Sequence, residues 1–133
     1  MPELAHLTLT DRPAAKHFMN LLFYYPPPLP GFVLDQLIKS SLLIKPKYEA
    51  VFSGFIENSK GRLLDDRLGE IKQPTLIIHG RDDKVIPLEV GQHLHQLIPN
   101  SKLIILDKSG HGAVWDSPWL VKQAILDFLK SSS

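Results

Sequence analysis

The spacing of hydrophobic and polar positions changes near Gln73. Before that residue, apolar side chains recur mostly at helical intervals, and strand signals are few. Residues 11–25 carry an apolar stripe that predicts a helix, and Pro13 fits its first turn. The proline-rich run at residues 26–30 cannot continue a helix, so the sequence predicts that this helix ends there.

Further helical segments are predicted in the same half of the chain. Residues 33–42 predict a second helix, and we expect Pro46 to end it because proline removes a helix hydrogen bond. Residues 48–56 predict a third helix, and residues 58–61 predict a turn. A short helix over residues 63–68 is expected to follow.

In the second half the pattern alternates between strand and helix. Apolar runs at Thr75–His79 and Lys102–Leu106 predict strands, and their continuous character is typical of a parallel sheet buried on both faces. A helical stripe at Leu88–Ile98 separates them. Ser117 is typical of a helix N-cap, and Pro118 fits the first position of a closing helix. The order predicts an α/β fold with a parallel β-α-β-α portion.

This portion does not supply enough strands for a finished sheet. An interior strand needs a paired neighbour on each side, and both predicted strands have interior character. We therefore expect the sheet to continue in other polypeptide, either an N-terminal half or a second copy, and we expect self-association. The predicted organisation is a mainly helical segment at residues 1–72 and an α/β portion at residues 73–133.

Composition narrows the class of protein. The chain has 133 residues, of which 44% are hydrophobic and 22% charged, as in one globular domain. A net charge of +1 gives no electrostatic footprint for nucleic acid. The absence of cysteine excludes disulfides, thiolate metal sites and a cysteine nucleophile. No apolar run reaches the roughly 20 residues of a membrane span and no signal-peptide pattern is present, so we expect a soluble chain, cytoplasmic by default.

Candidate chemistry follows the two predicted strands. Asp82 and Asp83 lie in a loop directly after the first strand, and His111 lies between two glycines after the second. Adjacent strand ends are about 5 Å apart, so a carboxylate and an imidazole can meet there. A carboxylate in that position fixes the histidine tautomer and stabilises the imidazolium. An aspartate pair in such a loop can equally be a turn former.

These two loops carry a family resemblance. The segment IKQPTLIIHGRDDKVIP resembles the penultimate strand and acid loop of α/β-hydrolases, G-x-x-D-x-x-x-P, and SKLIILDKSGHGAVWDSP resembles their last strand and histidine loop. The resemblance assigns the triad acid to Asp83, with Asp82 as a neighbour, and the triad histidine to His111. Residues 8–70 are similar to the helical cap, or lid, of monoacylglycerol lipase-like esterases.

The chain departs from that family at the nucleophile. No G-x-S-x-G motif occurs, and none of the serines has the flanking glycines. The resemblance implies serine-type hydrolysis of a carboxylic ester, without metal or organic cofactor, with His111 as general base and Asp83 orienting it. The serine and the oxyanion hole would come from residues outside this sequence, so we expect the chain alone to be inactive.

Alternatives to this interpretation stay open. The chain can be one half of a two-chain or swapped hydrolase, or a non-catalytic binding module. Related folds with this acid and histidine also cleave C–C bonds and epoxides. For an apolar ester we expect a substrate wall formed by Phe18, Leu22, Phe23 and Val85. Packing between helices also explains these aromatic residues, and lid contact with a lipid surface is a further option.

Overall fold

The structure, a computed structural model, describes residues 9–59 and 65–131. The chain divides into two compact units, the first formed by Met1–Met19 with Pro27–Leu63 and the second by Asn20–Pro26 with Leu64–Ser133. The boundaries of these units differ from those of the predicted segments, because Asn20–Pro26 packs with the C-terminal portion. The assignment of residues 1–72 as a cap stays a prediction.

The first unit is built from most of α1 (Arg12–Leu22) and from α2 (Gly31–Ser59). Asp11 caps the start of α1, since its Oδ1 accepts a hydrogen bond from the Ala14 amide at 2.8 Å. An apolar cluster holds the two helices together, and its members are Leu9, Ala15, Leu34, Phe18, Leu29 and Ile38. The expected helix at residues 11–25 is therefore present, although it ends three residues early at Leu22.

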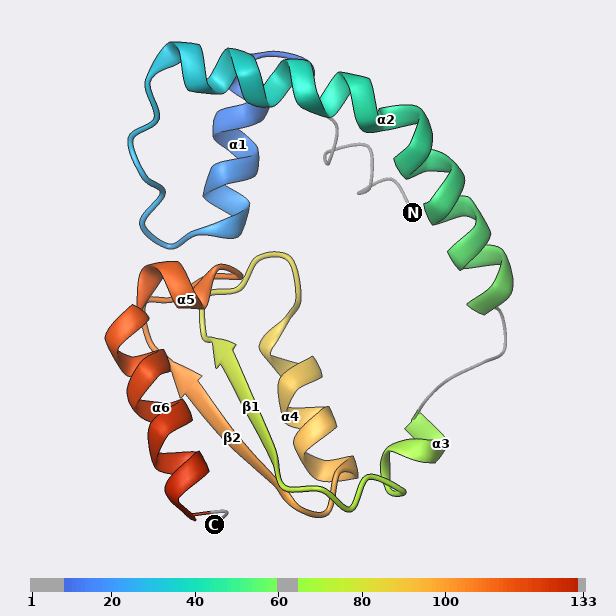
Figure 1. Ribbon diagram of the computed structural model, residues 1–133, viewed down its shortest axis with the longest axis vertical. Helices are drawn as coiled ribbons and strands as arrows, with labels where there is room; N and C mark the ends of the chain where they lie inside the picture. Colours follow the sequence, from blue (N-terminus) through green and yellow to red (C-terminus); the bar gives the residue numbers. More distant parts are fainter. Residues whose placement is uncertain (1–8, 60–64, 132–133) are drawn as a thin grey trace. The chain divides into compact units, whose positions relative to one another are not determined.

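The expected break at Pro46 is wrong. Helix α2 runs through Pro46 without interruption, so the predicted second and third helices are one element. Proline removes one backbone hydrogen bond and crowds the preceding turn, which costs about 3 kcal/mol locally. The remaining hydrogen bonds of the long helix compensate for that loss of stability. Figure 1 shows that α2 bends along its length. Residues 58 and 59 are helical rather than part of a turn, and residues 60–64 lie outside the described residues.

The second unit has the predicted order of strand, helix, strand and helix. After the short helix α3 (Asp65–Leu68), β1 (Thr75–Gly80) leads through α4 (Leu88–Leu97) to β2 (Ser101–Leu106). Figure 1 shows the two strands side by side and pointing the same way, and they pair in parallel from Thr75↔Ser101 to Gly80↔Leu106. This arrangement confirms the α/β fold class.

Two helices follow β2. The closing helix α6 (Pro118–Ser131) begins where Ser117 and Pro118 predict it, and a short helix α5 (Ala113–Asp116) that the sequence did not predict precedes it. Helices α4 and α6 flank the strands on opposite sides in the view of Figure 1. Val121 and Ala124 of α6 are buried, as the apolar stripe of this helix requires.

The strands are less buried than their sequence indicates. Apart from Gly80 and Leu106, which are buried, the residues of both strands are half-buried or exposed. The reason is that the described residues form a two-stranded sheet, so each strand has a hydrogen-bonded neighbour on one side. Each strand therefore has one edge without a partner strand in this sheet, and the expectation of fully buried strands is not met among the described residues. What the sheet does achieve is to bring the ends of β1 and β2 to one edge.

Candidate active site

Asp83 lies in the loop that follows β1. Its Oδ1 accepts hydrogen bonds from the amides of Val85 at 2.8 Å and Ile86 at 2.9 Å, so the side chain shapes its own turn. The side chain is 6% exposed. Asp83 therefore does form a turn, as its sequence also allowed, but it uses only Oδ1 for this purpose. Oδ2 remains available for another partner.

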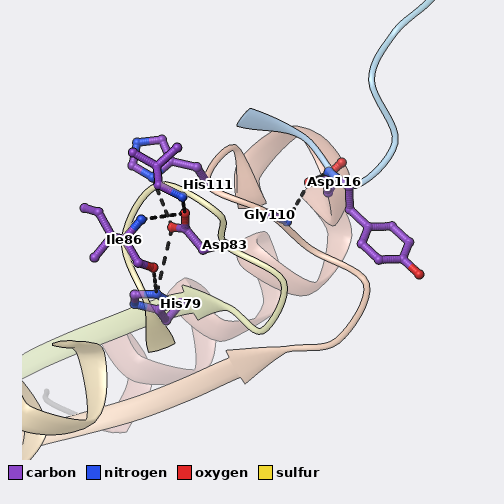
Figure 2. Close-up of polar contacts among 8 residues, drawn as sticks. His79, Asp83, Ile86, Gly110, His111 and Asp116 are labelled. Carbon is purple, nitrogen blue, oxygen red and sulfur yellow. Dashed lines mark hydrogen bonds and ion pairs between the residues drawn. The ribbon is translucent and has the colours of Figure 1, made fainter. Parts of the chain in front are cut away.

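That partner is His111, in the loop after β2. Its Nδ1 lies 3.0 Å from Asp83 Oδ2, although 28 positions separate the two residues in the sequence. Figure 2 shows the imidazole above the carboxylate, with the Ile86 amide on the other side of the same group. Asp82 takes no part through its carboxylate in this contact, and its amide instead donates to the Ser109 carbonyl at 2.9 Å. The contact expected at the strand ends is present, with Asp83 as the partner.

The charge state of Asp83 fixes the tautomer of His111. Burial is the largest single influence on Asp83 and opposes its ionisation, but the hydrogen bonds from Ile86, Val85 and His111 together outweigh it and hold the pKa of Asp83 below its usual range. An ionised carboxylate can only accept hydrogen bonds, so the proton of the contact belongs to His111 Nδ1. The lone pair is then on Nε2, which is the arrangement a general base needs.

The end of β1 and the histidine loop approach so closely that the last residue of β1 must be glycine. A Cβ atom on Gly80 would lie 2.3 Å from the carbonyl oxygens of both Ser109 and Gly110. The Arg81 amide also donates to the Leu106 carbonyl at 2.9 Å, and the Arg81 side chain pairs with Asp107. The structure therefore requires Gly80 for contact with the histidine loop.

His79 is a residue of the site that sequence reasoning missed. Its side chain is 10% exposed, and its Nε2 lies 3.0 Å from the Ile86 carbonyl and 3.8 Å from Asp83 Oδ2. A carbonyl oxygen only accepts, so Nε2 carries the proton and braces the loop that holds Asp83 (Figure 2). The sequence held no signal for this role beyond the position of His79 at a strand end, which fits a core or loop histidine equally well.

The four residues of the predicted substrate wall do not share one environment. The Leu22 carbonyl accepts the Gly112 amide at 2.7 Å, and the Phe23 ring lies 6.1 Å from that of Trp115, both beside the histidine loop. Val85 belongs to the acid loop and is 43% exposed. Phe18 packs against the apolar cluster of the first unit. A role for these side chains in binding substrate stays a prediction.

Among the described residues, no group of three or more histidine, aspartate or glutamate side chains is arranged to hold a metal ion. Nor does any helix in the described ranges combine the length and the apolar character that crossing a bilayer demands.

Comparison with known proteins shows the family of the chain. The sequence model of the alpha/beta hydrolase fold family matches residues 36–118. A 2-hydroxy-6-oxononadienedioate/2-hydroxy-6-oxononatrienedioate hydrolase of Cupriavidus pinatubonensis is 33% identical over 116 residues, which are 86% of this chain and 40% of that protein. The uncharacterised hydrolase YugF of Bacillus subtilis is 37% identical over 76 residues, 57% of this chain and 28% of its own length.

Solved structures show the same fold. A putative lipase of Acinetobacter baumannii AYE matches 97% of this chain and 44% of its own with a TM-score of 0.85 and 25% identity. A 2-hydroxy-6-oxo-6-phenylhexa-2,4-dienoate hydrolase of Rhodococcus sp. strain RHA1 matches 97% of this chain and 49% of its own with a TM-score of 0.69 and 21% identity. The chain thus spans less than half the length of these relatives. With the family model matching more than half of its residues, the chain belongs to the alpha/beta hydrolase fold family.

Proposed function

We propose that this chain contributes the acid–base part of a serine-type hydrolase active site, with His111 as general base and Asp83 as the acid that orients it. The observation that carries the proposal is the contact of 3.0 Å between His111 Nδ1 and the buried, ionised Asp83. Family membership supports it, because both residues occupy the loops that end neighbouring parallel strands.

The reaction follows from the tautomer. His111 Nε2 takes the proton of a serine hydroxyl as the oxygen attacks the substrate carbonyl, and it returns that proton to the leaving alkoxide. Asp83 stabilises the imidazolium that exists between the two transfers. The sequence contains no G-x-S-x-G motif, so in this proposal the serine and the oxyanion hole are donated by polypeptide outside the 133 residues.

We favour the ester bond of an apolar carboxylic ester as the substrate class. The similarity to a putative lipase over 97% of the chain supports this choice. A second candidate is hydrolysis of a carbon–carbon bond, and it is supported by the similarity to the 2-hydroxy-6-oxononadienedioate/2-hydroxy-6-oxononatrienedioate hydrolase of Cupriavidus pinatubonensis. Both reactions use the same base and the same orienting acid, so the substrate alone distinguishes them.

The proposal is tested by complementation. The chain is mixed with an N-terminal polypeptide of the same family that carries a G-x-S-x-G motif, and hydrolysis of p-nitrophenyl butyrate and of a 2-hydroxy-6-oxo-dienoate is measured. We expect no turnover by the chain alone and turnover by the stoichiometric complex. Asp83→Asn should lower kcat by roughly 10³–10⁴-fold, because the asparagine favours the wrong histidine tautomer.

Controls decide between the alternatives. Asp82→Asn is the matched control, since it removes a charge next to Asp83 without touching the His111 contact, and it should keep kcat within about threefold because it breaks no bond of the pair. Full activity in His111→Ala would refute the proposed base. A stoichiometric complex that turns over neither substrate would favour the non-catalytic binding module.

A further inference from the structure

Asp116, at the end of α5, accepts backbone hydrogen bonds from two segments, the neighbouring histidine loop and a segment far earlier in the sequence. Its Oδ2 accepts the amides of Gly110 at 2.8 Å and Tyr24 at 2.9 Å, and its Oδ1 accepts the amide of Tyr25 at 3.0 Å. Figure 2 shows the Asp116 carboxylate against the Gly110 amide. One side chain therefore joins the histidine loop to a segment some 90 positions earlier in the sequence.

These contacts bracket His111. Gly110 precedes it and is held by Asp116, while Gly112 follows it and donates its amide to the Leu22 carbonyl at 2.7 Å. The main chain is therefore fixed on both sides of the imidazole by Asp116 and by residues 22–25, which we call the bracing segment. The acid loop contacts the same stretch of chain just upstream, since Lys84 Nζ donates to the Asn20 carbonyl at 3.2 Å.

The bracing segment also packs closely against the glycines that flank His111. A Cβ atom on Gly110 would lie 3.0 Å from the Leu22 carbonyl oxygen and 3.1 Å from the Tyr24 nitrogen. A Cβ atom on Gly112 would lie 2.4 Å from the Phe23 ring. The glycines on either side of His111 are thus packed tightly against this segment.

We propose that Asp116 and the bracing segment are positioning elements that hold His111 where its Nδ1 meets Asp83. The imidazole is 38% exposed, so its orientation depends on that one contact and on where its main chain is fixed. If the main chain moved, the imidazole would lose Asp83 and with it the preference for a proton on Nδ1. The catalytic meaning of this inference rests on the proposed function, but the positioning itself is measurable without any turnover.

The test reads the tautomer of His111 by NMR. Long-range ¹H–¹⁵N correlations of the imidazole rings in the ¹⁵N-labelled chain report which nitrogen carries the proton. In the unsubstituted chain we expect His111 with the proton on Nδ1, and Asp83→Asn should abolish that preference. In Asp116→Asn, at least one of the three amides faces an NH₂ group and loses its hydrogen bond. We expect this variant to lower the ratio of the Nδ1–H to the Nε2–H form of His111, which we call the His111 ratio. The expected decrease is about two- to tenfold, because that is the effect of one lost hydrogen bond.

Asp127→Asn is the matched control, because it removes the same charge from α6 in the same unit, where the carboxylate bonds Gln123. It should leave the His111 ratio unchanged. His79 is the internal reference, since its Nε2–H bond to the Ile86 carbonyl belongs to the acid loop and not to the bracing segment. An unchanged His111 ratio in Asp116→Asn, with only a lower melting temperature, would overturn the proposal for Asp116.

A second pair of variants tests the bracing segment while Asp116 is present. This pair tests the positioning role of the segment even if Asp116→Asn fails to fold. Gly112 has φ −83°, which alanine also adopts, so the obstacle to Gly112→Ala is the Phe23 ring. Gly112→Ala should lower the His111 ratio, and adding Phe23→Ala should restore it. A ratio that is unchanged in Gly112→Ala, or that is not restored in the double variant, would overturn the role of the segment.

These readouts separate the two proposals. Failure of complementation with an intact response of the tautomer to Asp116→Asn would refute the hydrolase proposal alone. Restored turnover with a His111 ratio insensitive to Asp116 and Gly112 would refute the positioning role alone.

Discussion

Asp83 uses its two carboxylate oxygens for different purposes. Oδ1 accepts hydrogen bonds from two amides of its own loop, and Oδ2 accepts a hydrogen bond from the His111 imidazole. The two amides belong to the same loop as Asp83, so they orient the carboxylate independently of His111. The carboxylate is therefore pre-organised for its partner. The same bonds favour the charged form, which has a consequence for stability as a function of pH.

The unfolding free energy should depend on Asp83 at acid pH. The pKa of Asp83 is lower in the folded chain than in the unfolded chain, where it is about 3.9. Its contribution is therefore fully present above that pH and is lost as the pH falls through the lower, folded pKa. We expect the difference in unfolding free energy between the unsubstituted chain and Asp83→Asn to shrink between about pH 5 and pH 2.

Urea denaturation at a series of pH values measures this dependence. Asp82→Asn provides the baseline, because Asp82 offers the same charge change in the same loop. A stability difference between Asp83→Asn and the unsubstituted chain that is constant across this range would contradict the lowered pKa.

Gly80 should not tolerate a side chain. Gly80→Ala places a Cβ atom 2.3 Å from two backbone carbonyl oxygens, and backbone cannot move aside as a flexible side chain can. We expect a loss of about 1–3 kcal/mol of unfolding free energy and a disturbed His111 tautomer, measured by urea denaturation and by NMR.

Gly54→Ala is the matched control, because a Cβ atom there would meet nothing within 4 Å and the residue lies in a helix. That variant should gain about 0.5–1 kcal/mol. Equal stability of Gly80→Ala and the unsubstituted chain would mean that the two loops do not approach as closely as described.

At the scale of elements, α2 carries a proline that local rules place at a helix end. The Pro46 ring leaves the Leu42 carbonyl without its usual partner from the same helix. Local propensity thus gave the wrong boundary, whereas it gave the starts of β1, α4 and α6 correctly. The difference is that several residues together signal the start of a strand or helix. A single proline only lowers the local stability of a helix, and the other hydrogen bonds of the helix can offset that loss.

Replacing this proline should stabilise the helix. Pro46→Ala restores the amide that bonds the Leu42 carbonyl, and we expect up to about 3 kcal/mol of added helix stability with increased helical ellipticity. Pro30→Ala is the control, because Pro30 precedes α2 and contributes its carbonyl to the first turn. A lower melting temperature in Pro46→Ala than in Pro30→Ala would contradict the continuous helix.

At the scale of the whole molecule, the second unit holds a two-stranded sheet whose strands have the sequence of interior strands. Its closing helix α6 also exposes large apolar side chains, namely Trp119, Leu120, Ile125, Leu126 and Leu129. Free strand edges and apolar faces of this kind favour association. We therefore propose that the chain self-associates when no complementing polypeptide is present.

Sedimentation velocity of the chain over a range of concentrations tests this proposal. We expect species larger than a monomer, and we expect the double variant Trp119→Lys with Leu129→Lys to reduce them, because charge on an apolar face opposes its burial. Gln123→Lys adds charge to a polar position of the same helix and should change the distribution little. A monomer at all concentrations, with a single cooperative unfolding transition, would contradict the proposal.

The sequence by itself determined the class of fold, and its resemblance to a family predicted which carboxylate and which imidazole meet. Apolar runs and caps are local features, and a parallel strand pair brings the ends of its strands together, so the loops that carry residues 83 and 111 lie at one edge once β1 and β2 pair. Only the tertiary structure decided that Gly80 is required by the Ser109 and Gly110 carbonyls, and that His79 braces the acid loop. It also decided that Asp116 bonds the amides of residues 24 and 25, because a hydrogen bond across some 90 positions leaves no periodic trace in a sequence.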